Sequence, residues 1–293
     1  MSTELWTTRR LLEWTADYFK GRGIENPRLE VELLLATALH TNRVGLYLRY
    51  DEVPTDPERT AFRELVKRRA AGEPSAYLTG HKDFYSLDFD VNADVLIPRP
   101  ETETLVLEGV EFLRARAKEN AGFVPRVLDV GTGSGALAVA LARNLPAARL
   151  VAVDISASAL AMAKKNAEKH SVADRIEFRE SDLFAAVSAD ERFDLIVSNP
   201  PYVSQSEYDA LDRSVRDFEP RIALLSGEKG TEIVARIVAD APAHLEPGGR
   251  LLVEISPMIA EASLELLQGS PFIQFNIIND YAGLKRVILA EIE

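Results

Sequence analysis

Four consecutive residues, Asn199-Pro200-Pro201-Tyr202, directly follow an apolar run at 193–198 that has the composition of a buried strand. The Asn199 side chain offers a carbonyl acceptor, and the two prolines lack a backbone N–H and fix φ near about −65°. A planar NH2 group could donate its two hydrogens to the Asn199 oxygen and the Pro200 carbonyl while Tyr202 lies against its plane. The tetrapeptide predicts a site that positions an amine or amide nitrogen, although on its own it would be interpreted as an ordinary proline turn.

A glycine-rich loop upstream strengthens the functional interpretation. Gly131, Thr132, Gly133, Ser134 and Gly135 join an apolar strand at 127–130 to an expected helix at 136–143. Glycines there permit a tight turn and the close approach of a ligand to the backbone. The dinucleotide fingerprint would place the third glycine one residue later, and a phosphate loop would need a Lys followed by Ser or Thr. Neither phosphate motif is matched, so the loop indicates another kind of ligand.

Three aspartates stand at or near the ends of successive predicted strands: Asp129, Asp154 and Asp182. Asp129 could hold the loop or a cationic amine, Asp154 is placed to accept from two ribose hydroxyls, and Asp182 with Leu183 fits an adenine pocket. Each aspartate alone would more often be a cap or a turn residue. All three at one edge of a sheet favour a nucleoside site, because open α/β sheets bind ligands there.

Strands and helices alternate from Arg126 onward, which predicts a wound α/β sheet. The chain closes with two strands near 272–278 and 286–292, expected to form an antiparallel pair. The other expected elements are strands at 150–155, 176–179, 194–198 and 250–255 and helices at 157–169, 231–241 and 259–267.

The pattern before residue 72 is helical, with apolar stripes in each segment. We expect an N-terminal helical domain at 1–72, a connector with a hairpin at 73–95 and a catalytic domain at 96–293. A predicted third helix at 56–69 carries a basic cluster, which we interpret as a solvated helix face, with a docking surface for an acidic partner as the alternative. The cluster consists of Arg59, Arg63, Lys67, Arg68 and Arg69.

Composition excludes several classes of protein. The 34 basic and 46 acidic side chains give a net charge of −12, which argues against broad neutralisation of nucleic-acid phosphates. No apolar run approaches the ~18 residues of a membrane helix. The N-terminus does not resemble a signal peptide, so we expect a cytoplasmic protein. There are no cysteines and four scattered histidines, so no metal site is expected.

Taken together, these motifs resemble the release factor glutamine methyltransferase (HemK-like) family of class I S-adenosylmethionine-dependent methyltransferases. The similarity extends through nearly the whole chain. Beyond the glycine loop and the tetrapeptide, it rests on Glu73-Pro74, Tyr77-Leu78, Gly80, Pro98-Arg99-Pro100-Glu101-Thr102-Glu103, Glu219-Pro220-Arg221, Ala223-Leu224, Asp280, Gly283 and Arg286.

The resemblance implies a Rossmann-like seven-stranded sheet whose last strands are antiparallel, with a small N-terminal helical domain. We expect that domain to recognise the protein substrate, because the catalytic domain has no other large appendage. It implies methyl transfer from S-adenosylmethionine, leaving S-adenosylhomocysteine, to the glutamine N5 of the Gly-Gly-Gln motif in peptide-chain release factors. We expect a monomer that forms no stable complex with nucleic acid or membranes. Catalysis is assigned to Asn199, Pro200 and Tyr202. Cofactor binding is assigned to Gly131, Thr132, Gly133, Ser134, Gly135, Asp154, Asp182, Leu183 and Asn199, and substrate binding to Asn199, Pro200, Pro201, Tyr202, Arg99 and Glu101.

Three positions depart from the family pattern. Ser256 and Ile259 stand where the family has Gly and Gln after Glu254-Ile255, and Leu183 stands where an aromatic residue often packs on adenine. The tetrapeptide is also shared with adenine-N6 methyltransferases, so methylation of nucleic acid is the alternative. That activity would need base flipping and a phosphate-binding surface, which the acidic net charge disfavours. A noncatalytic protein that binds the cofactor or a release factor without turnover is a further alternative.

Overall fold

The protein is represented by a computed structural model that describes residues 5–120 and 122–293. It divides into two compact units. The first contains the chain up to His81 together with Arg213–Phe218, and the second contains Lys82–Asp212 and Glu219–Glu293. Each unit has its own hydrophobic core, so each is described by itself.

The first unit is helical, as the apolar stripes predicted. Its helices are α1 (Thr8–Lys20), α2 (Pro27–Ala38), α3 (Arg43–Leu48), α4 (Asp56–Ala70), α5 (Ser75–Thr79) and α10 (Arg213–Arg216). Thr7 caps α1 by accepting from the backbone N–H of Arg10, and Pro27 occupies the first turn of α2. The core contains side chains from α1, α2, α3 and α4, including Leu12, Phe19, Leu34, Leu35, Leu46 and Phe62.

The basic cluster on α4 is largely paired within this unit. Arg59 pairs with Asp56, Lys67 with Glu64 at 2.7 Å, Arg68 with Glu73 at 2.5 Å and Arg69 with Glu30 at 2.5 Å. These ion pairs neutralise most of the cluster, which supports a solvated helix face rather than a docking surface for an acidic partner.

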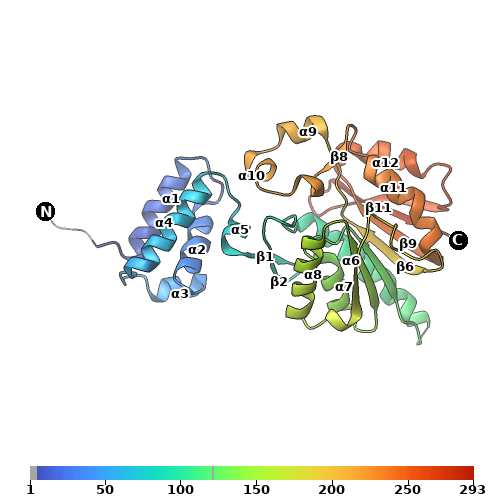
Figure 1. The fold of residues 1–293 in the computed structure, drawn as a ribbon, viewed down its shortest axis with the longest axis horizontal. Coiled ribbons are helices and arrows are strands. Elements are labelled where there is room, and N and C mark those ends of the chain that lie inside the picture. Colours follow the sequence, from blue (N-terminus) through green and yellow to red (C-terminus); the bar gives the residue numbers. More distant parts are fainter. Residues whose placement is uncertain (1–4, 121) are drawn as a thin grey trace. The chain divides into compact units, whose positions relative to one another are not determined.

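The second unit contains the predicted wound sheet, and its seven-stranded architecture is confirmed (Figure 1). The strands are β3 (Arg126–Val130), β4 (Arg149–Asp154), β5 (Ile176–Glu180), β6 (Phe193–Ser198), β9 (Leu245–Glu254), β10 (Gln274–Asn279) and β11 (Lys285–Glu291). Their order is β10-β11-β9-β6-β3-β4-β5, and β9, β6, β3, β4 and β5 are parallel. The last two strands pair antiparallel, and β11 runs against β9.

Helices cover both faces of this sheet. One face carries α6 (Glu103–Glu119), α7 (Ala136–Asn144) and α8 (Ala157–Lys169), and the other carries α11 (Glu232–Asp240) and α12 (Ala260–Leu267). The predicted hairpin is formed by β1 (His81–Phe84) and β2 (Leu87–Asp90), joined by Tyr85 and Ser86 with φ of 50° and 59°. Phe84 and Phe89 pack in the core beside α6 and α7.

The order of the strands creates a switch point beside β3. The chain moves outward from β3 through β4 to β5, and then crosses to β6 on the other side of β3. Val130 and Ser198, the last residues of β3 and β6, are register partners, and the Ser198 hydroxyl donates to the Val130 carbonyl at 2.7 Å. The glycine loop and the tetrapeptide therefore start side by side, at the place where open α/β sheets bind ligands.

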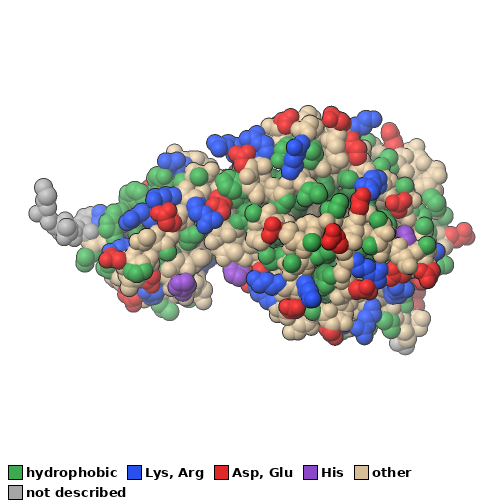
Figure 2. Space-filling model, in the orientation of Figure 1, with side chains coloured by type: hydrophobic (Ala, Val, Ile, Leu, Met, Phe, Trp, Pro, Cys, Tyr) green, Lys and Arg blue, Asp and Glu red, His purple; other side chains and the backbone are tan. Residues whose placement is uncertain are grey.

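Several short elements after the tetrapeptide were not predicted. They are β7 (Val203–Ser204), α9 (Gln205–Ala210) and β8 (Leu225–Gly227), besides α10 in the first unit. Among the described residues, no helix is both long and apolar enough to span a bilayer. On the face drawn in Figure 2, acidic and basic side chains are interspersed over the second unit. This face lacks the continuous basic surface that binds a nucleic-acid backbone.

Candidate active site

A cavity of about 270 Å³ opens in the second unit at the carboxyl ends of the parallel strands. It brings together most of the residues that the sequence predicted to bind a cofactor. Those on its wall are Gly131, Thr132, Gly133, Ser134, Asp154, Asp182, Leu183 and Asn199, and Pro201, which was predicted to bind the substrate, lines it as well.

The first two glycines of the loop open the backbone toward this cavity. Gly131 and Gly133 have φ of 76° and 55°, and a Cβ placed on either would meet no atom within 4 Å. Gly135 has a different task. Its φ is 81°, and a Cβ there would lie 3.0 Å from the Cα of Ala163, so this glycine allows the turn into α7 to pack against α8. Gly135 does not line the cavity.

Asp129 holds the loop from behind. Its side chain is fully buried, and Oδ2 accepts from the Thr132 hydroxyl at 2.7 Å and from the Ala138 N–H at 3.2 Å. Burial raises the pKa of this carboxyl to about 7. Of the two roles that the sequence left open, the geometry supports loop support rather than binding of a cationic amine.

Asp154, the last residue of β4, bridges two backbone segments. Its Oδ2 accepts from the Gly133 N–H at 2.8 Å and its Oδ1 from the Ser156 N–H at 2.9 Å. Burial raises the pKa of this carboxyl, and the two N–H donors oppose the rise. Each oxygen keeps a lone pair for a further donor, so the carboxylate can also accept from vicinal hydroxyls at the cavity wall.

Asp182 already has a cationic partner that the sequence did not indicate. Its Oδ2 accepts from Nη2 of Arg236 at 2.8 Å, and Arg236 lies on α11 and lines the cavity. The two side chains are about half exposed, at 50% and 48%. An amine approaching Asp182 would share its carboxylate with this guanidinium.

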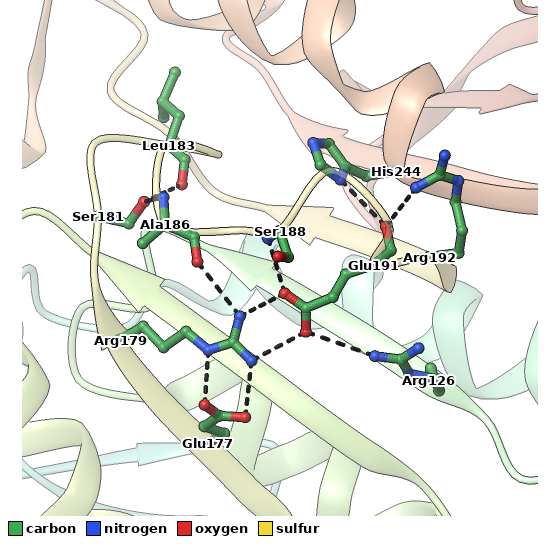
Figure 3. Close-up of polar contacts among 10 residues, drawn as sticks. All are labelled: Arg126, Glu177, Arg179, Ser181, Leu183, Ala186, Ser188, Glu191, Arg192 and His244. Carbon is green, nitrogen blue, oxygen red and sulfur yellow. Dashed lines mark hydrogen bonds and ion pairs between the residues drawn. The ribbon is translucent and has the colours of Figure 1, made fainter.

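The loop that carries Asp182 and Leu183 is held by hydrogen bonds within itself (Figure 3). The Ser181 hydroxyl donates to the Leu183 carbonyl at 2.8 Å and accepts from the Ala186 N–H at 2.9 Å. Leu183 adopts φ of 51°, a left-handed conformation that a non-glycine residue rarely takes. The turn therefore depends on the surrounding contacts to hold Leu183 at the cavity wall.

Arg179 on β5 fastens the same loop to the sheet (Figure 3). It donates to both carboxylate oxygens of Glu191 at 2.7 and 3.0 Å, and to the Ala186 carbonyl at 3.4 Å. It also donates to Glu177 at 2.8 Å. Hydrogen bonds from Arg179 lower the pKa of the Glu191 carboxyl to about 2. The sequence did not indicate this contact, because it depends on how the loop between β5 and β6 folds back over Arg179.

Asn199 presents an oriented amide. Its Nδ2 donates to the Thr102 hydroxyl at 3.0 Å, which leaves Oδ1 as the acceptor of the amide. Thr102 also lines the cavity, although the sequence did not single out its side chain. Pro201 is on the cavity wall, whereas the buried Pro200 and the partly buried Tyr202 are not. The Tyr202 hydroxyl donates to Oε1 of Glu254 at 3.0 Å.

Arg99 joins two of the motifs that carry the resemblance. Its Nη2 lies 2.5 Å from Oε1 of the buried Glu219, and Glu219 Oε2 accepts from the Ile97 N–H at 3.2 Å. Arg99 does not line the cavity, and neither does Glu101, whose side chain is exposed. Arg99 thus serves here to hold the segment before α6 beside Glu219.

The cavity also has an apolar wall that the sequence analysis missed. Ile155 and Ile222 line it with exposed fractions of 50% and 58%, and Ala223 and Ile233 line it as well. Large aliphatic side chains that remain this exposed can cover the face of a planar ring.

Comparisons with known proteins identify family profiles and relatives that match this chain. The PrmC N-terminal domain profile matches residues 10–80, and the Methyltransferase small domain profile matches residues 107–218. The chain is 50% identical to the release factor glutamine methyltransferase of Rhodopirellula baltica, over 97% of this chain and 95% of that protein. It is 44% identical to the release factor glutamine methyltransferase of Geobacter sulfurreducens, over 97% of this chain and 96% of that protein.

Among solved structures, the fold is similar to that of the hMettl16 catalytic domain in complex with MAT2A 3′UTR hairpin 6. The TM-score is 0.55 at 19% identity, covering 78% of this chain and 82% of that one. At this level of identity the likeness concerns the fold alone.

Proposed function

Because the chain belongs to the release factor glutamine methyltransferase family, we propose that it methylates the side-chain amide nitrogen of the glutamine in the Gly-Gly-Gln motif of peptide-chain release factors. The methyl donor in this proposal is S-adenosylmethionine, bound in the cavity at the switch point.

The observation that carries the proposal is the orientation of the Asn199 amide. Its NH2 is already bonded to Thr102, so the oxygen is the group left to accept from a substrate. A cavity wall at the carboxyl edge of the sheet that presents an acceptor suits a substrate NH2. A substrate hydroxyl could donate its one hydrogen to the same oxygen, so the preference for NH2 rests on the family relationship and on the proposed second acceptor, the Pro200 carbonyl.

The residues of the cavity fit S-adenosylmethionine. The open backbone at Gly131 and Gly133 leaves room for a ligand, the Asp154 carboxylate can accept from a ribose diol, and the apolar wall suits an adenine ring. Asp182 and Leu183 would lie at the adenine end. When bound, the cofactor supplies an electrophilic methyl group on a sulfonium.

The chain's own residues contribute positioning. An amide nitrogen is a poor nucleophile because its lone pair is delocalised into its carbonyl. Two acceptors, Asn199 Oδ1 and the Pro200 carbonyl, would hold the two hydrogens, favour pyramidalisation and aim the nitrogen. Tyr202 is fixed by its bond to Glu254, so its ring can limit rotation of the amide. Burial next to the Glu254 carboxyl raises the pKa of the Tyr202 phenol, so Tyr202 stays neutral.

The remaining assignments concern recognition of the protein substrate. We assign release-factor recognition to the N-terminal helical domain at 1–72, linked through the connector at 73–95 to the methyltransferase domain at 96–293. The exposed Glu101 would contact the release factor, and Arg99 would support that contact through Glu219. A release-factor substrate would imply that the enzyme is cytoplasmic. The monomeric state expected from the sequence stays a prediction.

The test is methyl transfer from labelled S-adenosylmethionine to a purified release factor, with the modified residue located by mass spectrometry. We expect label on the glutamine of the Gly-Gly-Gln motif and none on a factor in which that glutamine is replaced by glutamate. Transfer to DNA but not to the release factor would contradict the proposal and favour the adenine-N6 alternative.

A further inference from the structure

A set of polar side chains lies behind Asn199 and extends away from the cavity. Asn199 Nδ2 donates to Thr102 Oγ1 at 3.0 Å, and the Tyr202 hydroxyl donates to Glu254 Oε1 at 3.0 Å. Thr102 is 4% exposed, and Glu254, the last residue of β9, is 0% exposed. Two hydrogen-bonded pairs, Asn199 with Thr102 and Tyr202 with Glu254, are thus built from three separate parts of the chain.

The set contains one buried acceptor that lacks a donor. Oε2 of Glu254 has no hydrogen-bond partner with good geometry among the described residues, and a buried carboxylate oxygen left unpaired is costly. Although the structure shows no hydrogen bond between Glu254 and Thr102, the Thr102 hydroxyl lowers the pKa of that carboxyl. Its oxygen already accepts from Asn199, so its hydrogen is available to the Glu254 carboxylate.

We propose that Glu254 is a positioning residue that, through Thr102, sets which end of the Asn199 amide faces the substrate. The ionised Glu254 takes the Thr102 hydrogen, the Thr102 oxygen then accepts from Asn199 Nδ2, and Asn199 Oδ1 is left to accept from the substrate. The inference rests on the proposed function, because it explains how the acceptor for the substrate NH2 is oriented.

Protonation of Glu254 reverses this order. A neutral carboxylic acid can donate to Thr102, the Thr102 hydrogen then turns to Asn199, and the amide flips to present NH2 toward the substrate NH2. Burial is the main influence and raises the pKa of Glu254 to about 7. The Thr102 and Tyr202 hydroxyls and the charge of Arg286 oppose this rise, whereas the charge of Glu101 adds to it. Glu254 is ionised above this pKa, so methyl transfer should increase as the pH rises through about 7.

The first test removes the Thr102 hydroxyl without changing the size of the side chain. Thr102→Val should slow single-turnover methylation of a release factor by about 100-fold, the size of effect seen when one preorganised polar group is lost. Thr102→Ser keeps the hydroxyl and should restore most of the rate. Calorimetric binding of the release factor without cofactor should weaken in the Val variant and recover in the Ser variant.

The second test uses the pH profile. In Glu254→Gln the Tyr202 hydroxyl can donate to the amide oxygen, so the NH2 group faces Thr102 and imitates the protonated acid. This variant should be slow at every pH and lose the rise through pH 7. Melting temperature and cofactor affinity, measured beside it, show whether the variant is folded.

The outcomes separate this inference from the proposed function. A wild-type enzyme that does not methylate the release factor would refute the proposed function itself. A wild-type enzyme that does so, with Thr102→Val as fast as Thr102→Ser or with Glu254→Gln retaining the wild-type pH profile, would overturn only the relay. If Thr102→Val fails to fold, the Glu254→Gln profile still decides.

Discussion

A single carboxylate in this site can both hold the loop and accept from a ligand, and Asp154 is the clearest case. The sequence predicted its place at the end of β4, and the structure adds that the same carboxylate fastens Gly133 and Ser156. Periodicity cannot indicate such bonds, because they depend on the exact path of the loop. The same reason explains why Thr102 and Arg236 were missed: each acts through a partner that is distant along the chain.

We expect Asp154→Ala to weaken S-adenosylmethionine binding by about 1.5–3 kcal/mol, the range for hydrogen bonds to a charged group. The loss has two sources, since the ribose acceptor disappears and the Gly133 N–H loses its anchor. Isothermal calorimetry measures it, with the exposed Asp190→Ala as the matched control. Equal affinity of Asp154→Ala and wild type would rule out this assignment.

At the scale of elements, long periodic segments were predicted well and short ones were not. The helix at 157–169 was placed correctly, whereas α9, α10 and β8 were missed. Short helices are not stable alone and form where tertiary contacts hold them, so their own sequences carry little signal. The loop after β5 is similar: Asp182 and Leu183 were expected at the cavity, but the ion pair that holds their loop was not visible in the sequence.

That ion pair yields a prediction for the loop. Arg179→Ala should destabilise the protein by about 1.5–3 kcal/mol, because Glu191 loses its bidentate partner and the loop loses its tie to β5. Cofactor affinity should fall as well, since Leu183 is then less firmly held. Thermal unfolding and calorimetry report the two effects, with Arg143→Ala on the exposed face of α7 as the control. Unchanged affinity in a clearly destabilised variant would show that the loop does not contribute to binding.

At the scale of the whole molecule, the division into helical and α/β units agrees in outline with the pattern of the sequence. The sequence placed the end of the connector near residue 95, but Phe84 and Phe89 of the hairpin pack in the core of the second unit. Buried aromatic residues in a short hairpin look the same in sequence whether they serve one unit or the other. The segment Arg213–Phe218 groups with the first unit although it lies far along the chain from the rest of that unit, and local sequence patterns do not indicate such long-range grouping.

A shortened protein tests the recognition role of the N-terminal unit. A variant that begins at Lys82 retains both phenylalanines of the hairpin, so we expect it to keep S-adenosylmethionine binding. It should lose methylation of an intact release factor. Equal rates for the shortened and full-length proteins on the intact factor, at matched cofactor occupancy, would argue against a recognition role.

The account depends most directly on Asn199 as the acceptor that holds the glutamine amide. Single-turnover methyl transfer to a release factor, with cofactor binding measured separately, should be about 100- to 1000-fold slower in Asn199→Ala, because the substrate amide is then held by one acceptor and can rotate. Asn199→Asp still accepts from NH2 and should fall between the Ala variant and wild type. An Asn199→Ala enzyme that transfers the methyl group as fast as wild type would contradict the mechanism.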